Sequence, residues 1–223
     1  MNETSKGGPL FKNREDAGRL LAEELSFLKS KRGELIVLAI PRGGAVVAKE
    51  VATALGAPLD VVVTRKIGAP GYPELAVGAV TDDGEVIVES DLLAKLGVSD
   101  AYVRGEGSRQ MDEIRRRTVE YRGDRLYPSL VGMTVVIVDD GVATGATIRA
   151  AIQSVKRRKA AFVILAVPVG PGDTISDLSR LADQVVCLST PEPFFAIGEF
   201  YQEFEPVEDG QVREILKDYR PGF

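Results

Sequence analysis

The chain has 223 residues, of which 44% are hydrophobic and 27% are charged, and its net charge is −5. These values are typical of a globular protein with one sizeable core and an appended lobe, and the negative charge argues against a broad nucleic-acid-binding face. The chain has no histidine and a single cysteine, Cys187, which excludes a Ser-His-Asp triad, a His-ligated zinc and an intrachain disulfide. No apolar run approaches about 18 residues and residues 1–9 are polar, so we expect a cytoplasmic protein without a membrane span or signal peptide.

The first third of the chain alternates between helical spacing and short apolar runs. We predict a helix, a strand, a helix and a strand over residues 13–29, 35–40, 45–55 and 59–64. Residues 65–74 are rich in Gly and Pro and lack periodicity, which predicts a loop.

The middle of the chain is more polar. Two short strands over residues 76–81 and 85–89 flank Asp82-Asp83-Gly84, a pattern that predicts a β-hairpin. A short helix is expected over residues 91–96, and the charge-dense segment 99–122 is predicted to be helical over its second half. We interpret two basic runs as solvated helix faces, at residues 115–117 and 156–159.

The last part returns to regular alternation. Strands are predicted over residues 131–138, 161–167 and 184–188, and helices over residues 148–158, 174–181 and 212–217. Alternation of strands and helices predicts an α/β fold, a twisted parallel sheet with helices on both faces. We expect one domain over residues 1–223, with a core (10–188), an inserted flap of a β-hairpin and helices (67–125) and a C-terminal hood (189–223).

The most informative segment runs over residues 135–147. Four β-branched apolar residues predict a strand buried on both faces, and Asp139 and Asp140 follow where that strand must end. Unpaired amides and the helix dipole at the N-terminus of the next helix favour an anion. Glycines allow close backbone approach, and threonine hydroxyls can donate to phosphate or cap the helix. The loop therefore predicts a phosphate site, composed of Gly141, Val142, Ala143, Thr144, Gly145, Ala146 and Thr147.

The two aspartates would repel a phosphate, but they can accept hydrogen bonds from neutral hydroxyls or lie near a metal. A ligand with a phosphate and an adjacent diol, such as ribose 5-phosphate, would satisfy both halves of the motif. The alternative is that the aspartates form a strand-end turn and the threonines only cap the helix. The chain has no Gly-Lys dipeptide and no G-x-G-x-x-G pattern, which argues against a Walker A loop and a dinucleotide fingerprint.

Residues 135–147 resemble the signature of type I phosphoribosyltransferases, which bind 5-phosphoribosyl 1-diphosphate. The likeness extends over roughly residues 10–205. The resemblance implies that Asp139 and Asp140 contact the ribose hydroxyls as the catalytic pair, and that residues 141–147 hold the 5′-phosphate.

A second strand-to-helix turn contains Arg42, Gly43 and Gly44, and it is a candidate anion site for the same physical reasons. Arg65 and Lys66 end the second strand and add two cations at the same edge of the sheet. The alternatives are a tight turn with an exposed arginine, and ordinary surface charges. The resemblance implies that Arg42, Gly43 and Gly44 bind pyrophosphate, and the two cations suggest that Arg65 and Lys66 bind it as well. The resembled family has a mobile loop at the position that follows Lys66, which could close as a lid; the alternative is that the lid is the region 102–122.

Aromatic residues gather after the last predicted strand. The resembled family covers its site with a hood that selects the acceptor, so Phe194 and Phe195 are candidates for stacking on a planar base. The alternative is a tail that packs back on the core.

The resemblance implies transfer of the phosphoribosyl group to a nitrogenous base, with release of pyrophosphate. Mg²⁺ would be bound mainly through the ligand, with Asp139 and Asp140 as candidate protein ligands. The resemblance also implies a homodimer, and we expect no nucleic-acid or membrane partner. A regulatory protein that senses the sugar diphosphate or a nucleotide is the alternative, and a phosphatase or kinase is a weaker one because the chain lacks their motifs.

Overall fold

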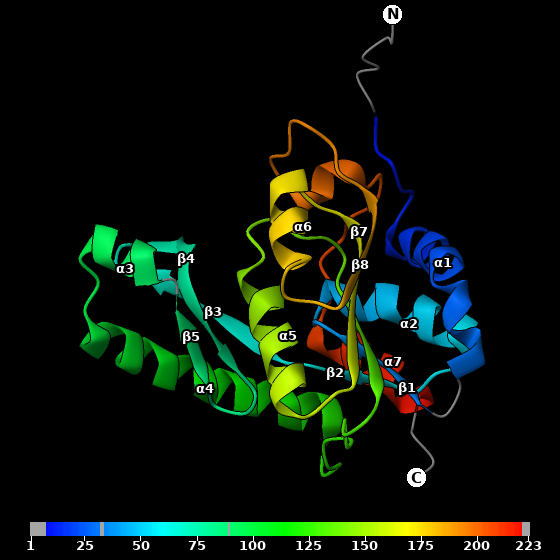
Figure 1. The fold of residues 1–223 in the computed structure, drawn as a ribbon, viewed down its shortest axis with the longest axis horizontal. Coiled ribbons are helices and arrows are strands. Elements are labelled where there is room, and N and C mark those ends of the chain that lie inside the picture. Colours follow the sequence, from blue (N-terminus) through cyan, green and yellow to red (C-terminus); the bar gives the residue numbers. More distant parts are fainter. Residues whose placement is uncertain (1–7, 32–33, 89, 220–223) are drawn as a thin grey trace, which may run out of the picture.

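A parallel sheet lies at the centre of the molecule, with helices on both faces and a smaller lobe beside it (Figure 1). The computed structural model describes residues 8–31, 34–88 and 90–219. All five strands are parallel, in the order β2-β1-β6-β7-β8. They are Leu59–Val61 (β2), Leu35–Ala39 (β1), Thr134–Val138 (β6), Phe162–Val169 (β7) and Gln184–Ser189 (β8). The predicted sheet is confirmed, and the predictions for residues 1–7 and for residue 89 lie outside the described residues.

Alternate side chains of each strand point into two separate hydrophobic layers. On β1, Leu35 and Val37 pack in one layer, whereas Ile36 and Leu38 pack in the other. Burial on both faces explains why the strands are continuous apolar runs in the sequence. The first layer is covered by Arg14–Glu24 (α1), Gly43–Leu55 (α2) and Asp209–Asp218 (α7), and the second by Ala146–Arg157 (α5) and Gly172–Leu178 (α6).

The larger lobe, which contains the parallel sheet, also has two short 3-10 helices, at Ser26–Lys31 and Ile197–Phe200. Within the part of the chain that the structure describes, no helix has both the length and the apolar character needed to cross a membrane.

The smaller lobe, which we call the flap, consists of an antiparallel sheet and two helices. Its elements are Thr64–Ala69 (β3), Tyr72–Thr81 (β4), Val86–Val88 (β5), Ser90–Leu96 (α3) and Asp100–Arg122 (α4). The hairpin predicted around Asp82-Asp83-Gly84 is confirmed, since this turn joins β4 to β5.

The loop predicted over residues 65–74 is wrong, because most of these residues belong to β3 and β4. The pairing of the two strands is irregular on both sides of Gly68, where an added Cβ would lie 2.6 Å from the carbonyl oxygen of Pro73. A bulge tolerates glycine and proline that would disfavour a regular strand. These residues therefore concealed the strand pattern.

The prediction that only the second half of residues 99–122 is helical is also wrong. Helix α4 begins at Asp100, and the Ser99 side chain caps it by accepting a hydrogen bond from the Tyr102 amide at 3.2 Å. An added Cβ at Gly107 would lie 3.3 Å from Val86. Glycine, which weakens a helix in the sequence, here allows α4 to lie close to β5.

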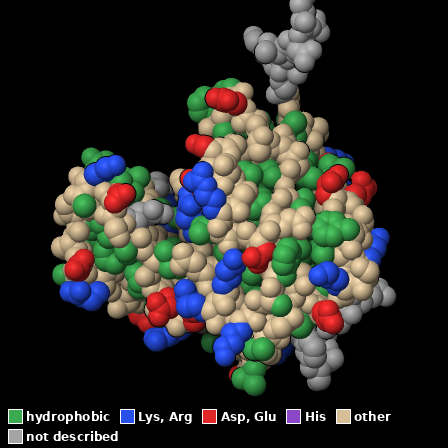
Figure 2. All heavy atoms as spheres, in the orientation of Figure 1, with side chains coloured by type: hydrophobic (Ala, Val, Ile, Leu, Met, Phe, Trp, Pro, Cys, Tyr) green, Lys and Arg blue, Asp and Glu red, His purple; other side chains and the backbone are tan. Residues whose placement is uncertain are grey.

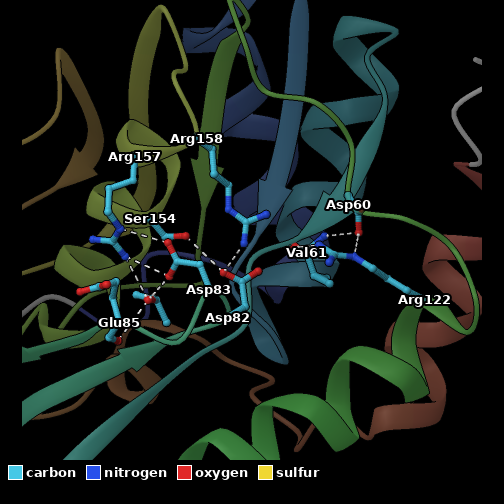
Figure 3. Close-up of polar contacts among 10 residues, drawn as sticks. Asp60, Val61, Asp82, Asp83, Glu85, Arg122, Ser154, Arg157 and Arg158 are labelled. Atoms are coloured by element: carbon cyan, nitrogen blue, oxygen red, sulfur yellow. Dashed lines mark hydrogen bonds and ion pairs between the residues drawn. The ribbon is translucent and has the colours of Figure 1, made fainter.

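Hydrogen bonds and ion pairs fasten the β4–β5 turn to the C-terminal end of α5 (Figure 3). Arg157 donates two hydrogen bonds of 3.0 Å to the Asp83 carboxylate, and Arg158 donates one of 2.9 Å to Asp82. Ser154 Oγ also donates to Asp82, at 3.2 Å. The predicted solvated face is therefore wrong for Arg157 and Arg158, because acids more than 70 positions away in the sequence reach them.

A more deeply buried pair holds α4 to β2 (Figure 3). Arg122 Nε donates to Asp60 Oδ1 at 2.8 Å, and the two side chains are 3% and 9% exposed. The guanidinium of Arg122 also lies over the ring of Tyr127, 4.0 Å from its centroid. On the α5 side of the molecule, Lys and Arg side chains gather where the flap meets the core (Figure 2).

Candidate functional site

The loops that follow β1 and β6 lie next to each other at one edge of the sheet. Ala39 is opposite Val138 in the parallel register, and the Ile40 amide donates to the Val138 carbonyl at 2.9 Å. In the sheet, β1 lies between β2, the next core strand in the sequence, and β6, which comes much later in the sequence, so the direction in which strands are added changes beside β1. Open α/β sheets bind ligands at such a switch point, outside the carboxyl ends of their strands. The strand order therefore brings together the predicted phosphate loop, the acidic pair and the Arg42 turn.

The predicted phosphate loop, residues 141–147, is open to solvent at its centre. Ala143 and Thr144 are exposed, and their amides donate to no backbone carbonyl among the described residues. Gly145 has φ +76°, a left-handed conformation that suits glycine, and α5 begins at the next residue. The unpaired amides of the first turn of α5 extend the same group of donors. An anion can reach these donors from solvent.

Neighbouring elements fix both flanks of this loop. The Val142 amide donates to the Val169 carbonyl at 2.9 Å, at the end of β7. Thr174 Oγ1 of α6 donates to the Ala143 carbonyl at 3.1 Å. From the flap, Thr64 Oγ1 donates to the carbonyl of Thr147 at 3.2 Å. The conformation of the loop is thus held by β7, α6 and the flap together.

Asp139 and Asp140 have different surroundings. The Asp140 side chain is 13% exposed, and its Oδ2 accepts a hydrogen bond of 2.7 Å from Nε of Arg14, which is 10% exposed. Asp139 keeps part of its surface exposed, and its Oδ1 accepts from the Asp140 amide at 2.9 Å. The sequence treats the two acids alike, but in the structure only Asp140 is held in a buried ion pair.

Both carboxylates face the first turn of α2. A Cβ added at Gly43 would lie 1.8 Å from Asp140 Oδ2, and one added at Gly44 would lie 2.9 Å from Asp139 Oδ1. Contacts this short mean that any added side chain would have to displace the neighbouring acids, so glycine is favoured at both positions for packing. The peptide bond between Pro41 and Arg42, just before this turn, is cis.

The environment of the acids disfavours their charged forms. Burial raises the pKa of Asp139 well above its usual range, and the neighbouring charge of Asp140 adds to the shift. Burial also raises the pKa of Asp140, while the Arg14 guanidinium opposes that increase. Hydroxyl donors or a cation near the pair would favour the ionised acids.

The three predicted cations belong to two different lobes of the molecule. Arg42 belongs to the core, and its Nη1 lies 3.7 Å from Oε2 of the exposed Glu208, a contact expected to be weak. Arg65 belongs to β3 and donates through Nε to Gln110 Oε1 at 2.9 Å, and burial and the nearby Arg117 lower its pKa. Arg65 and Lys66 also line a cavity of about 360 Å³ between β3 and α4.

The C-terminal hood lies over the start of the phosphate loop. A Cβ added at Gly141 would lie 2.7 Å from Cγ2 of Ile197. Phe194 packs against Phe200, with ring centroids 5.0 Å apart, whereas Phe195 is 77% exposed. Of the two phenylalanines predicted to stack on an acceptor, Phe195 is the one with an open ring.

Two residues that contact the acidic pair were not predicted. Arg14 lies near the start of the predicted first helix, where no local pattern indicates a partner 126 positions away. Tyr201 donates through its hydroxyl to the Asp140 backbone carbonyl at 2.6 Å. The aromatic tail was the only sequence signal for Tyr201.

One cation of the run 115–117 also differs from its prediction. Arg115 and Arg116 are largely exposed, as expected, but the Arg117 side chain is only 15% exposed. Arg117 Nε donates to Glu113 Oε1 at 2.7 Å. Its positive charge lies close enough to Arg65 to lower the pKa of that residue, so Arg117 and Arg65 are neighbouring cations.

The oxygen donors at this edge fit a magnesium ion that brings most of its own ligands. Residues 8–31, 34–88 and 90–219 contain no group of three or more His, Cys, Asp or Glu side chains that could hold a metal. Mg²⁺ is commonly held by one or two carboxylates together with substrate phosphates and waters. Asp139 offers one such carboxylate, while that of Asp140 is paired with Arg14.

Comparisons with known proteins agree with this fold. A model of the phosphoribosyl transferase domain matches residues 10–203, and the chain belongs to this family. The chain is 45% identical over 207 residues to proteins named as phosphoribosyl transferases in two Mycobacterium tuberculosis strains, CDC 1551 / Oshkosh and H37Rv. This match covers 93% of the chain but 46% of those proteins, so the chain spans about half the length of these curated relatives. The crystal structure of TT1426 from Thermus thermophilus is similar with a TM-score of 0.80 and 43% identity, covering 94% of this chain and 98% of that one.

Proposed function

We propose that this protein transfers the 5-phosphoribosyl group of 5-phosphoribosyl 1-diphosphate to a nitrogenous acceptor and releases pyrophosphate. Membership of the phosphoribosyl transferase family supports this class of reaction. The observation that carries the proposal is the exposed loop at Ala143 and Thr144, which lies beside the acidic pair at the switch point of the sheet.

The ribose 5-phosphate half of the ligand is assigned to the β6–α5 segment. Backbone amides and threonine hydroxyls of residues 141–147 are assigned to the 5′-phosphate, because the centre of this loop, at Ala143 and Thr144, is exposed. Asp139 accepts hydrogen bonds from the ribose hydroxyls, since this residue is partly exposed at the edge of the sheet. Asp140 contributes its charge from within the ion pair with Arg14.

The pyrophosphate half is assigned to Arg42, Arg65 and Lys66, together with the turn at Gly43 and Gly44, whose lack of side chains leaves room for the adjacent acids. Breaking the bond to pyrophosphate builds positive charge on the ribose ring and negative charge on the leaving group. Fixed cations stabilise the leaving group, and the aspartates stabilise the ring. Because both groups of residues are held by the sheet, they also orient the ligand before reaction.

Bound Mg²⁺ would neutralise part of the diphosphate charge. Asp139 is the residue that would contribute to holding it, because the Asp140 carboxylate is already paired with Arg14. The acceptor is assigned to the hood, where the exposed ring of Phe195 can stack on a planar base.

A regulatory protein that senses the sugar diphosphate without turnover is the second candidate. The same alternative includes a sensor of a nucleotide monophosphate, which needs no pyrophosphate site. The crowded first turn of α2 favours that form, because two carboxylates face the backbone where pyrophosphate would bind.

Pyrophosphate release separates these functions. The sugar diphosphate, Mg²⁺ and a panel of purine, pyrimidine and nicotinate-like acceptors are incubated with the protein, and binding is measured in parallel by calorimetry. We expect release with one class of acceptor. Tight binding without release for any acceptor would support the sensor, and absence of binding would contradict both functions.

A pair of variants tests the phosphate loop in the same assay. Thr144→Ala removes one loop hydroxyl, and we expect it to weaken ribose 5-phosphate binding by about 1 kcal/mol, or roughly fivefold. Thr118→Ala on α4 makes the same chemical change far from the loop and is expected to leave binding unchanged. Equal effects of the two substitutions would remove Thr144 from the site.

A further inference from the structure

Arg14 joins the N-terminal helix, the hood and the acidic pair. Its Nε donates to Asp140 Oδ2 at 2.7 Å, and its Nη1 donates to the Glu205 carbonyl at 2.8 Å. The guanidinium lies over the ring of Phe204, 3.7 Å from the centroid. Three contacts of different kinds thus hold this side chain, and all three are fixed by residues distant in the sequence.

The Asp140 carboxylate has little freedom in this arrangement. An added Cβ at Gly43 would lie 1.8 Å from its Oδ2, so α2 closes one side of the group. The Tyr201 hydroxyl donates to the Asp140 backbone carbonyl at 2.6 Å, which fixes the main chain beneath it. Among the described residues, Arg14 is the positively charged partner of this carboxylate. Its removal would leave a buried acid without a counter-charge.

We propose that Arg14 is a positioning residue for sugar binding, and this inference rests on the proposed function. Arg14 holds Asp140 against α2 and so keeps the adjacent Asp139 carboxylate directed to the ribose hydroxyls. The Asp139 Oδ1 accepts from the Asp140 amide at 2.9 Å, so a change in the conformation of Asp140 is passed directly to Asp139. The two acids therefore have separate tasks, one anchored and one facing the ligand.

The hood takes part in this arrangement through Phe204 and Tyr201. Phe204 also packs on Tyr201, with ring centroids 4.9 Å apart. The same two aromatic residues therefore contact Arg14 and the Asp140 main chain. This makes the position of the acidic pair depend on the hood that covers it.

The pair Arg122–Asp60 provides a matched control. It is also a buried arginine–aspartate contact, at 2.8 Å, and its guanidinium also lies over an aromatic ring, that of Tyr127. It holds α4 to β2 and touches neither the acidic pair nor the phosphate loop. A purely structural role for Arg14 would make the two arginines equivalent.

Calorimetric binding of the sugar diphosphate with Mg²⁺ tests the inference, with thermal unfolding of each variant as a second readout. We expect Arg14→Gln to weaken binding at least tenfold, and Arg14→Lys to recover part of that loss because it keeps the charge but not the two-nitrogen geometry. Arg122→Gln is expected to lower the unfolding temperature while changing the dissociation constant less than twofold. Phe204→Leu, which keeps the ion pair, is expected to show an intermediate loss and remains informative if Arg14→Gln does not fold.

A double-mutant cycle then shows whether Arg14 acts through Asp140. We expect Arg14→Gln combined with Asp140→Asn to bind no more weakly than Asp140→Asn alone, because the interaction is already lost. Unchanged binding by both Arg14→Gln and Phe204→Leu would overturn the inference, as would a tenfold loss for Arg122→Gln. Failure of the unaltered protein to bind the sugar diphosphate would instead overturn the proposed function, and the inference with it.

Discussion

The β1–α2 and β6–α5 segments have the same succession of a buried strand, a glycine-containing turn and a helix, and their strands are neighbours in the sheet. The N-termini of the two helices nevertheless differ. Helix α2 begins at Gly43 and Gly44 against two carboxylates, whereas α5 begins behind the exposed residues Ala143 and Thr144. What packs against a helix N-terminus therefore decides whether an external anion can reach it.

The acidic pair connects the two segments. Asp139 and Asp140 follow β6 in the chain, but they face the first turn of α2. Negative charge is favourable at a helix N-terminus because of the helix dipole. The N-terminus of α2 therefore faces acids within the protein, whereas the residues that precede α5 are exposed.

The largest expected effect on ligand binding comes from removing the negative charges of Asp139 and Asp140, which connect the two segments. Asp139→Asn combined with Asp140→Asn is expected to weaken binding of the sugar diphosphate by more than about 100-fold, because charged hydrogen bonds contribute roughly 1.5–3 kcal/mol each. Calorimetry measures the binding, and circular dichroism checks that the variant is folded. Unchanged binding would refute the assignment of the acids to the ribose hydroxyls.

The next largest effect is expected from adding a side chain at the crowded first turn of α2. In Gly43→Ala the new Cβ must displace the Asp140 carboxylate, and we expect a loss of about 1–3 kcal/mol in the free energy of unfolding, with weaker sugar binding. Gly105→Ala in α4 is the control, because an added Cβ there meets nothing within 4 Å. That control is expected to be neutral or stabilising by up to about 1 kcal/mol. Equal stability of both variants in urea unfolding would show that α2 is not crowded.

A smaller effect distinguishes the ligands of the two turns. We expect Arg42→Ala to weaken pyrophosphate binding about tenfold and to leave ribose 5-phosphate binding nearly unchanged, because Arg42 lies on the α2 side. Thr144→Ala is expected to show the reverse preference. Competition binding with the two anions measures both, and equal losses for Arg42→Ala would remove it from the leaving-group site.

The smallest expected effect depends on pH. The pKa of Asp139 is raised in the folded protein above its unfolded value of about 3.9, so ionised Asp139 costs stability above the folded pKa. Asp139→Asn keeps the oxygen that accepts from the Asp140 amide but cannot ionise. We expect it to increase the free energy of unfolding at neutral pH, with a gain that declines as the pH falls toward the unfolded pKa. A gain that is constant from about pH 4 to 8 in thermal unfolding would contradict this explanation.

The sequence predicted the central sheet well because its strands are runs of β-branched residues buried on both faces. It predicted the flap less well. There, Gly68 and Pro73 belong to an irregular pair of strands and Gly107 lies within a helix. In each case a close tertiary contact explains a residue that local preference assigns to a loop.

The candidate site shows the same division. The residues of the two turns are contiguous in the sequence, so their grouping could be predicted from the strand order. The partners of Arg14 and Arg158 could not, because both ion pairs join residues more than 70 positions apart. Charge patterns along a chain indicate exposed faces, but only the fold determines which acids reach them.

The attachment of the β4–β5 turn to α5 limits how the flap can move. Asp83 is tied to Arg157, and Thr64, opposite Thr81 in the sheet, is tied to the phosphate loop. This end of the hairpin is therefore held more firmly than its opposite end. We expect any displacement of the flap to increase along β3 and β4 and to be greatest at the turn that joins them. An added Cβ at Gly71, in that turn, would meet no atom within 4 Å. In any closing movement of the flap, Arg65, which lies near the attached end, would be displaced less than the turn at Gly71. We expect hydrogen exchange to be slowest at the Asp83 end and fastest at Gly71.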